Sequence, residues 1–348
     1  MKKVGILTFH WATNYGAVLQ SYATASFLKS AGYDAEIINY RPRIALIKQT
    51  LRRIKSRDTL SKKREGEIDL FRRECLPLSK KVYRSSRALS RCSGYSALIT
   101  GSDQVWNESF TLRGEGRPTL SYFLPFGGEG VKRIAYAVSF GQDSVGEEYK
   151  RVALDSIRAL DAVSVRENTG LAILEEMGVA SVRVPDPTAL LSREEYSAIA
   201  DKSSCKTPRV FSYFLRTGAE KELSARNKAK DVLGILKDSE MPRVYGIPEW
   251  LAAIRGADAV VTNSFHGTML SIIFGTPFVF LSSGKSKMND RITTLLSSVG
   301  LSERIADSEA DIERALGAPI EWGRVNLALS DYRRVGADFL LRALEGKE

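Results

Sequence analysis

The residue of this chain best suited to move a proton is His266, one of only two histidines among 348 residues. It lies in the stretch "DAVVTNSFHGTMLSIIFGTPFVFL", between an apolar run that predicts a buried strand and one that predicts a helix. The carboxyl end of a parallel strand faces the crevice where ligands bind, and an imidazole with an ordinary pKa of about 6.5 both gives and takes protons. His266 is therefore a candidate general acid or base; a histidine that only packs at a helix start is the alternative.

Polar and positively charged residues accompany this histidine. A helix start offers free backbone N–H groups to an anion, and the stretch "SSGKSKMNDRI" follows the next predicted strand. Its cations fit either phosphate ligands or ordinary solvated charges. The candidate ligand-binding residues of this region are Asn263, Ser264, Gly267, Lys285, Lys287 and Arg291.

Two loops near the start of the sequence carry residues that suit a sugar. In "FHWATNYGAVLQ", a glycine before a helix permits close backbone approach, although a plain tight turn explains it equally well. The absence of G-x-G-x-x-G makes a dinucleotide site a weak hypothesis. "GSDQVWN" combines a carboxylate, two amides and an aromatic ring, the mixture that binds hydroxyls and sugar ring faces. The candidates are Asn14, Tyr15, Gly16, Gln20, Asp103, Gln104, Trp106 and Asn107, with Asp103 as a simple N-cap left open.

A third loop, "SVRE", brings Arg166 to the end of a predicted strand. A guanidinium there can hold a carboxylate or phosphate with two parallel hydrogen bonds. An ion pair with Glu167, or one between domains, would need no ligand.

The elements that must position these loops alternate between strand and helix. Strands are predicted at 4–9, 35–39, 97–100, 133–139, 162–165, 209–215, 243–245, 258–262 and 277–281. Helices are predicted at 17–31, 147–160, 168–177, 220–233, 248–255, 267–274 and 290–299. This alternation predicts an α/β fold with two doubly wound, Rossmann-like domains that face each other across a cleft. We place the first domain at 1–190, the second at 191–325 and a closing helix at 326–348.

Charge is concentrated in one part of the first domain. Residues 41–91 hold 17 Lys and Arg against 5 Asp and Glu, a balance of +12 in a chain whose net charge is +10. Apolar residues recur at helical spacing among these charges, which predicts a basic amphipathic helical excursion. It suits an anionic membrane surface, while a solvated excursion packed on the domain is the alternative. No motif typical of nucleic-acid binding accompanies the charge, so nucleic acid is not an expected partner.

Composition argues against several other classes of protein. Three cysteines without C-x-x-C spacing and two histidines predict neither a disulfide framework nor a metal site. No run of about 18 apolar residues is found, and the first residues lack the apolar length of a signal peptide. We therefore expect a cytoplasmic protein, with peripheral contact at the inner face of the plasma membrane as an option.

Taken in order, eight stretches of the chain resemble the polysaccharide pyruvyl transferase family, and the resemblance runs from Gly5 to about Leu344. They are "TFHWATNYGAVLQSYA", "GSDQVWN", "YAVSFG", "SVRE", "DPT", "TNSFHGTMLSIIFGTPFV", "MNDRITTLL" and "IEW". The family implies a fold like that of GT-B glycosyltransferases. It also implies transfer of a pyruvyl group from phosphoenolpyruvate to two hydroxyls of a sugar as a cyclic ketal, with phosphate released and no metal or cofactor. The acceptor would belong to a bacterial-type cell-surface polysaccharide, such as an exopolysaccharide or capsule, or to its polyprenyl-pyrophosphate-linked precursor.

The resemblance gives roles to particular residues. His266 matches the essential histidine and Arg166 the strand-end arginine, and we expect Asp103 to accept a proton from the sugar. Ser264 departs from the family, which commonly has arginine two positions before the histidine. Either another cation supplies the missing charge or the donor is not phosphoenolpyruvate. The candidates for that charge are Arg166, Arg216, Lys285, Lys287 and Arg291.

Two other functions stay open at this stage. A nucleotide-sugar glycosyltransferase would share the architecture, but no convincing Glu-x7-Glu pattern follows His266. A non-catalytic membrane-surface protein would use residues 41–91 and consume no donor.

Overall fold

The computed structural model describes residues 1–55, 58–215, 219–239, 244–282 and 290–346. The chain forms two compact units. The first consists of Met1–Leu190 and Arg334–Glu348, and the second of Leu191–Arg333. Each unit is built on a parallel sheet, so the predicted α/β fold class is confirmed.

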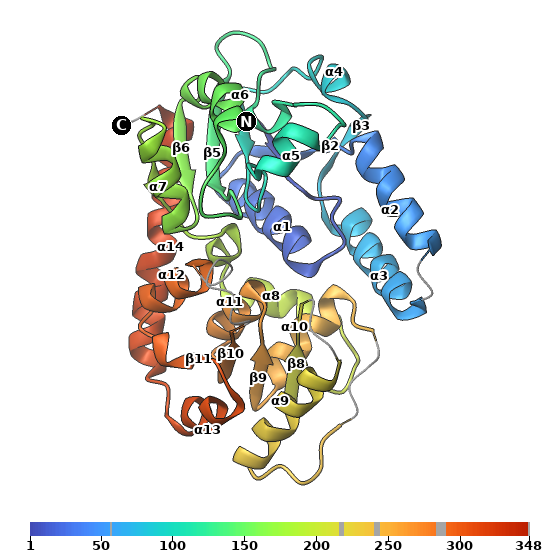
Figure 1. The fold of residues 1–348 in the computed structure, drawn as a ribbon, viewed down its shortest axis with the longest axis vertical. Helices are drawn as coiled ribbons and strands as arrows, with labels where there is room; N and C mark the ends of the chain where they lie inside the picture. The colour runs from blue at the N-terminus through green and yellow to red at the C-terminus, as the bar shows by residue number, and fades with distance from the viewer. Residues whose placement is uncertain (56–57, 216–218, 240–243, 283–289, 347–348) are drawn as a thin grey trace. The chain divides into compact units, whose positions relative to one another are not determined.

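The first unit contains a seven-stranded parallel sheet in the order β3-β2-β1-β4-β5-β6-β7 (Figure 1). Its strands are β1 (Lys3–Leu7), β2 (Asp34–Tyr40), β3 (Leu78–Tyr83), β4 (Ala97–Thr100), β5 (Lys132–Val138), β6 (Ala162–Val165) and β7 (Val182–Arg183). The order reverses at β1, because β2 and β3 continue on one side and β4 to β7 on the other. Such a reversal sends the connections after β1 and β4 to opposite faces and creates the crevice where sheets of this kind bind ligands.

Helices connect these strands. They are α1 (Tyr15–Ser30), α2 (Arg43–Lys55), α3 (Thr59–Cys75), α4 (Ser86–Leu89), α5 (Glu108–Arg113), α6 (Glu147–Arg158) and α7 (Asn168–Glu176). Helix α1 begins where the side chain of Asn14 accepts a hydrogen bond from the Ala17 N–H at 2.7 Å. It ends before Gly32, whose φ of +87° suits glycine.

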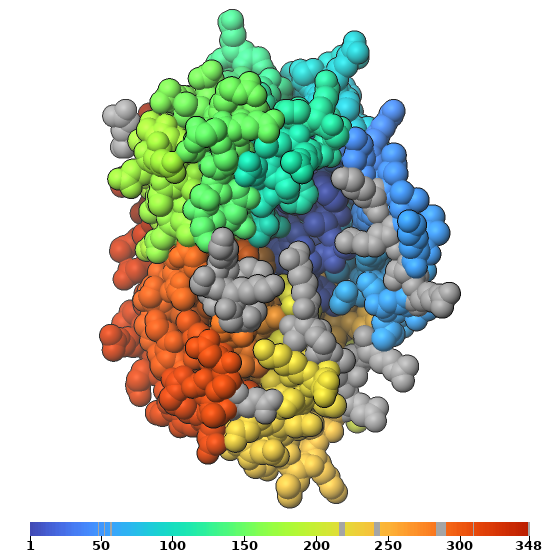
Figure 2. Space-filling model, in the orientation of Figure 1, coloured from blue at the N-terminus to red at the C-terminus, as the bar shows by residue number. Residues whose placement is uncertain are grey.

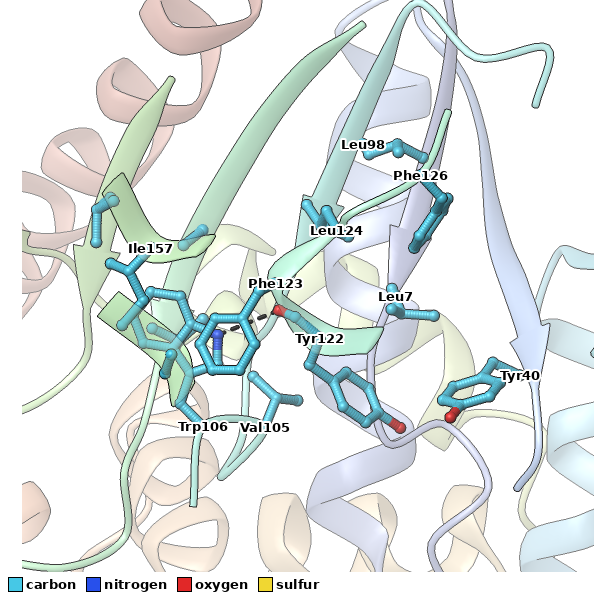
Figure 3. Close-up of a cluster of buried hydrophobic side chains, with 14 of the residues drawn as sticks. Leu7, Tyr40, Leu98, Val105, Trp106, Tyr122, Phe123, Leu124, Phe126 and Ile157 are labelled. Atoms are coloured by element: carbon cyan, nitrogen blue, oxygen red, sulfur yellow. Dashed lines mark hydrogen bonds between the residues drawn. The ribbon is translucent and has the colours of Figure 1, made fainter. Parts of the chain in front are cut away.

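A large aromatic cluster forms part of the core of the first unit (Figure 3). The indole of Trp106 stacks on Phe123 with 5.2 Å between ring centroids and donates a hydrogen bond to the carbonyl of Tyr122 at 3.1 Å. Tyr149 of α6 packs edge-on against Phe123 and Phe140. These contacts pack Trp106, which belongs to the loop after β4, firmly into the core. The polar residues of that loop are therefore held in place by the core.

The basic segment is only partly a helical excursion. Helices α2 and α3 follow the prediction, and Figure 2 shows this blue segment on the surface of the first unit. Strand β3, however, pairs with β2 and forms the edge of the sheet. Its central residues Lys80 and Lys81 are exposed, as is typical of edge strands that resist pairing with other chains.

The second unit contains a smaller parallel sheet, with four strands in the order β11-β10-β9-β8. The strands are β8 (Val210–Tyr213), β9 (Ala259–Thr262), β10 (Phe278–Leu281) and β11 (Ile305–Ala306). The helices are α8 (Arg193–Ala200), α9 (Ala219–Val232), α10 (Ile247–Gly256), α11 (Phe265–Phe274), α12 (Asp290–Ser298) and α13 (Glu309–Gly317), followed by α14 (Trp322–Glu345), which ends in the first unit. The strand predicted at 243–245 is not found at Val244 and Tyr245, and Arg243 lies outside the described residues.

No helix in the described part of the chain is long and apolar enough to cross a membrane. No group of His, Cys, Asp or Glu in the same residues has an arrangement that could hold a metal ion.

Candidate functional site

Two strand-end regions contain the residues singled out by the sequence, one in each unit. In the first unit, the loops after β1 and β4 lie at the reversal of strand order. Gly101 begins the second loop with a φ of +109°, and a Cβ there would lie 2.2 Å from the Tyr136 carbonyl oxygen. Only glycine fits this close approach, which directs the following residues, Ser102 and Asp103, to the sheet edge.

Buried polar side chains join these two loops. The side-chain amide of Gln20 donates to Thr8 Oγ1 at 2.8 Å, and its carbonyl oxygen accepts the Ser102 N–H at 3.2 Å. Thr8 Oγ1 in turn donates to the Ser102 carbonyl at 3.0 Å. Gln20 is fully buried and its amide holds the two loops together, so its contact with a sugar stays a prediction.

Arg166 is likewise an internal residue. Its side chain is 0% exposed, its Nη1 lies 2.5 Å from Asp186 Oδ2, and its Nε lies 3.6 Å from Glu167 Oε2. Burial opposes the charged guanidinium, but attraction to Asp186, Glu167 and Asp103 outweighs it and raises the pKa of Arg166. The structure therefore shows the ion pair that was the alternative interpretation of Arg166, and its catalytic and donor-binding role stays a prediction.

The carboxylates beside Arg166 are themselves fixed by hydrogen bonds. Asp186 Oδ1 accepts the N–H of Thr188 at 3.0 Å and its hydroxyl at 2.7 Å. Glu167 Oε1 accepts the hydroxyl of Ser139 at 2.5 Å. Buried charges need such partners, and this network explains why "SVRE" and "DPT" occur in one chain.

Three other predicted acceptor residues are also enclosed. Trp106 is fully buried in the aromatic cluster, and its role as a platform for a sugar ring stays a prediction. Tyr15 and Gly16 are buried in the first turn of α1, and direct sugar contact by them likewise stays a prediction. All three residues belong to the packed core beneath the loops, where large aromatic residues such as Trp106 and Tyr15 are commonly found.

The remaining predicted acceptor residues lie nearer the surface. Asn14 caps α1, and Asn107 caps α5 while donating to the Phe140 carbonyl at 2.9 Å. Asp103 and Gln104 are half-buried, and Asp103 Oδ1 accepts the Gln104 N–H at 2.8 Å. Asp103 stays the predicted base. It is an acidic residue of the loop after β4 and is only half-buried.

Sequence reasoning missed a second cluster in the first unit, formed around His10. This imidazole is fully buried, with Nδ1 3.3 Å from the Thr8 carbonyl and Nε2 3.4 Å from Asn39 Oδ1. Burial, together with the positive charges of Arg41 and Arg72, lowers the pKa of His10 to about 3. The signal available in the sequence was the histidine in "FHWATNYG", directly after a buried strand.

In the second unit, the β9–α11 connection carries His266. Ser264 caps the helix, since its hydroxyl accepts the Gly267 N–H at 3.3 Å. A Cβ at Gly267 would lie 2.9 Å from Thr262 Oγ1, so a side chain there would crowd the end of the strand. His266 follows at the first turn, is partly exposed, and packs its ring edge-on against Phe265 with 5.2 Å between centroids. The structure thus places a partly exposed histidine, whose Nε2 is itself buried, at a helix N-terminus.

The other predicted donor ligands have different positions. The side chain of Asn263 is bound to the backbone of Leu215, accepting its N–H at 2.6 Å and donating to its carbonyl at 3.0 Å. It therefore ties the loop after β8 to the end of β9. Arg291 is half-buried in the first turn of α12. Arg216, Lys285 and Lys287 lie outside the described residues.

Comparisons with solved structures find similar chain arrangements at low sequence identity. UDP-GlcNAc 2-epimerase from Neisseria meningitidis, bound to UDP-GlcNAc, is 10% identical with a TM-score of 0.49, covering 98% of this chain and 100% of its own. The corresponding epimerase from Methanocaldococcus jannaschii is 11% identical with a TM-score of 0.49, covering 91% and 92%. The glycotransferase of kitacinnamycin is 12% identical with a TM-score of 0.47, covering 98% of each chain.

Comparisons with protein sequences and with family models give two further findings. Among curated protein sequences none matches it. The family model for polysaccharide pyruvyl transferase matches residues 14–285. That range includes α1, the loop after β4, the Arg166 network and the helix start that carries His266. The chain therefore belongs to the polysaccharide pyruvyl transferase family.

Proposed function

We propose that this protein transfers the pyruvyl group of phosphoenolpyruvate to two hydroxyls of a sugar, forming a cyclic ketal and releasing phosphate. The sugar belongs to a cell-surface polysaccharide of bacterial type or to its lipid-linked precursor. Family membership supports the type of reaction. The position of His266 supports the mechanism.

The observation that carries the proposal is the contrast between the two histidines of the sequence. His10 is fully buried and has a pKa of about 3, so near neutral pH it holds no extra proton to give. His266 is partly exposed at the start of α11. Of the two histidines, His266 is therefore the better candidate for an imidazole acid, because it is partly exposed whereas His10 is fully buried.

The chemistry balances with a single general acid. Protonation of the methylene carbon of phosphoenolpyruvate turns it into a methyl group and makes the neighbouring carbon electrophilic. One sugar hydroxyl adds to that carbon, and the second displaces phosphate and closes the ketal. Of the two hydroxyl protons, one restores the acid and the other leaves with hydrogen phosphate. In this scheme His266 gives the first proton.

The helix that follows His266 supplies part of the charge complementarity. The positive end of the α11 dipole favours the carboxylate or phosphate of the donor. Ser264 caps this helix where the family commonly has arginine, so the chain needs another cation for the donor. Arg216, Lys285, Lys287 and Arg291 remain the predicted sources of that charge.

The reaction is tested by measuring phosphate release from phosphoenolpyruvate with a panel of synthetic galactosides, glucosides and N-acetylmannosaminides. We expect release that depends on one acceptor class, together with a product whose mass shows the added pyruvyl group. Reactions without acceptor are the control for simple hydrolysis. No release across the panel, with thermal stabilisation by a sugar nucleotide instead, would contradict the proposal and favour a glycosyltransferase.

A peripheral membrane contact through α2 is part of the same proposal. Ile47, Leu51 and Ile54 recur at helical spacing on this helix and are 56%, 50% and 70% exposed. Exposed arginine and lysine residues, Arg43, Arg53 and Lys55, lie on the same helix. An apolar stripe flanked by cations fits the boundary between anionic headgroups and acyl chains, where a lipid-linked acceptor would be found.

Vesicle sedimentation tests this contact. We expect binding to vesicles containing phosphatidylglycerol, weaker binding to pure phosphatidylcholine, and a loss of about tenfold or more in the variant L51S/I54S, because each buried apolar side chain contributes about 1.5–3 kcal/mol. Leu327→Ser removes an equally exposed leucine from α14 and is the matched control, with unchanged binding expected. Equal binding of L51S/I54S and wild type would contradict the membrane contact.

A further inference from the structure

Arginines gather at the carboxyl ends of β1, β2 and β3, outside the residues used by the proposed reaction. Arg41 directly follows β2, and its N–H donates to the Tyr83 carbonyl at 2.8 Å. Two residues later, the Arg43 N–H donates to the Arg84 carbonyl at 3.0 Å. The chain leaving β2 thus runs beside the chain leaving β3, which places Arg84 beside Arg41.

A third arginine, Arg72, is bound to the backbone of the loop after β1. Arg72 of α3 is 2% exposed, its Nε donates to the His10 carbonyl at 2.6 Å, and its Nη2 donates to the Ala12 carbonyl at 2.8 Å. Asn39 Oδ1 accepts a hydrogen bond from Arg41 Nε at 3.0 Å and lies 3.4 Å from His10 Nε2. Arg41 and Arg72 therefore belong to one connected group of side chains around His10.

The charge of this group is only partly balanced by acids. Arg72 pairs with Asp69, but within the described part of the chain neither Arg41 nor Arg84 takes part in an ion pair. The nearby carboxylate of Glu115 accepts hydrogen bonds from Tyr40 and Ser86. Burial and the charge of Arg84 lower the pKa of Arg41, and burial with the charges of Arg41 and Arg73 lowers that of Arg72 to about 10. These shifts describe a strongly positive environment that an anion would relieve.

We propose that Arg41 and Arg84, supported by Arg72 and the His10–Asn39 contact, form a binding site for a diphosphate. Two guanidinium groups on adjacent strand ends present paired N–H donors, the arrangement that suits phosphate oxygens. Helix α2 begins at Arg43, so its exposed apolar stripe continues directly from this site. The diphosphate comes either from a soluble molecule or from a polyprenyl-linked acceptor, and the second identification rests on the function proposed above.

Calorimetry on the full chain with inorganic pyrophosphate tests the site, with variants R41Q, R84Q and R41Q/R84Q. We expect the double variant to bind at least about tenfold more weakly, because it loses the charge-assisted hydrogen bonds to the phosphate oxygens. Arg151→Gln removes an exposed arginine from α6 and is the matched control, with affinity expected within twofold of wild type. Wild-type binding should also weaken as salt is raised.

A second arm distinguishes the source of the diphosphate. Phosphatidylcholine vesicles containing farnesyl pyrophosphate are compared with vesicles containing farnesol, in sedimentation with the same variants. Tighter binding to the diphosphate vesicles than to free pyrophosphate, lost in R41Q/R84Q, supports the lipid-linked source, and equal affinity supports the soluble one. No binding in either arm, or equal binding by R41Q/R84Q and wild type, overturns the site. Neither arm requires donor or turnover, so a failure of the proposed reaction leaves this result unaffected.

Discussion

The two histidines follow strands of the two parallel sheets, yet their surroundings differ completely. His10, after β1, is enclosed by Asn39, Arg41 and Arg72 and lies in a fully buried network. His266, after β9, stands at the open first turn of a helix and is partly exposed. A polar residue at a strand end is therefore not by itself a ligand, because neighbouring side chains can satisfy it. The two histidines differ in burial, since His10 is fully buried and His266 is partly exposed.

The largest expected effect concerns the buried arginine of the first unit. Arg166→Met leaves Asp186 and Glu167 in the interior without their counter-ion. We expect the free energy of unfolding, measured by urea titration, to fall by about 3–5 kcal/mol. Arg151→Met, on the surface of α6, is the control and should change it by no more than about 0.5 kcal/mol. An Arg166 variant with normal stability and no activity would instead make this residue a substrate ligand.

The next effect is the dependence of stability on pH that arises from His10. Its pKa is about 6.5 in the unfolded chain and about 3 in the folded one, so between these values the unfolded state binds more protons. The stabilising contribution is fully present above about pH 6.5 and is lost as pH falls toward 3, at up to about 1.4 kcal/mol per pH unit.

Urea titrations between pH 4 and 7 on wild type and His10→Gln measure this contribution. The difference in unfolding free energy between them should change with pH at close to that slope. His266→Gln is the matched variant, since it makes the same substitution at the other of the two histidines. A constant difference between wild type and His10→Gln over this range would show that His10 is not held neutral by burial.

The smallest effect concerns the cap beside His266. Ser264→Ala removes the hydroxyl that accepts the Gly267 N–H, and we expect a loss of about 1 kcal/mol in unfolding free energy. Ser264→Gly should cost only a few tenths of a kcal/mol, because glycine is tolerated at this position of a helix. Thermal unfolding in parallel with urea titration measures both. If the two variants lose equal stability, Ser264 does not act as a cap.

Local patterns in the sequence were sufficient to predict most of the architecture. Strand β4 was predicted at 97–100 and β6 at 162–165, because each is a short apolar run with clear ends. The position of His266 at a helix start followed from the same reasoning. Strand β3 was missed because "LSKKVY" has exposed lysines in its centre, and an edge strand of this kind does not show the apolar run of a buried one.

The roles of individual side chains were harder to predict, because they depend on partners distant in sequence. Arg166 meets Asp186 twenty residues later, and Gln20 meets Ser102 eighty-two residues later. Trp106 is buried by Phe123 and Phe140, which single-residue reasoning could not distinguish from an exposed platform. Residue types at strand ends thus indicated which loops form the candidate site. The structure was needed to show which side chains of those loops are buried.

The most direct test of this account is the rate of acceptor-dependent phosphate release by His266→Ala, measured with and without added imidazole. The account predicts a loss of about 10²–10⁴-fold in kcat, with an unchanged unfolding transition and partial recovery when imidazole replaces the missing acid. A folded His266→Ala protein that turns over at the wild-type rate would contradict the central claim, because the partly exposed histidine would then not be the acid.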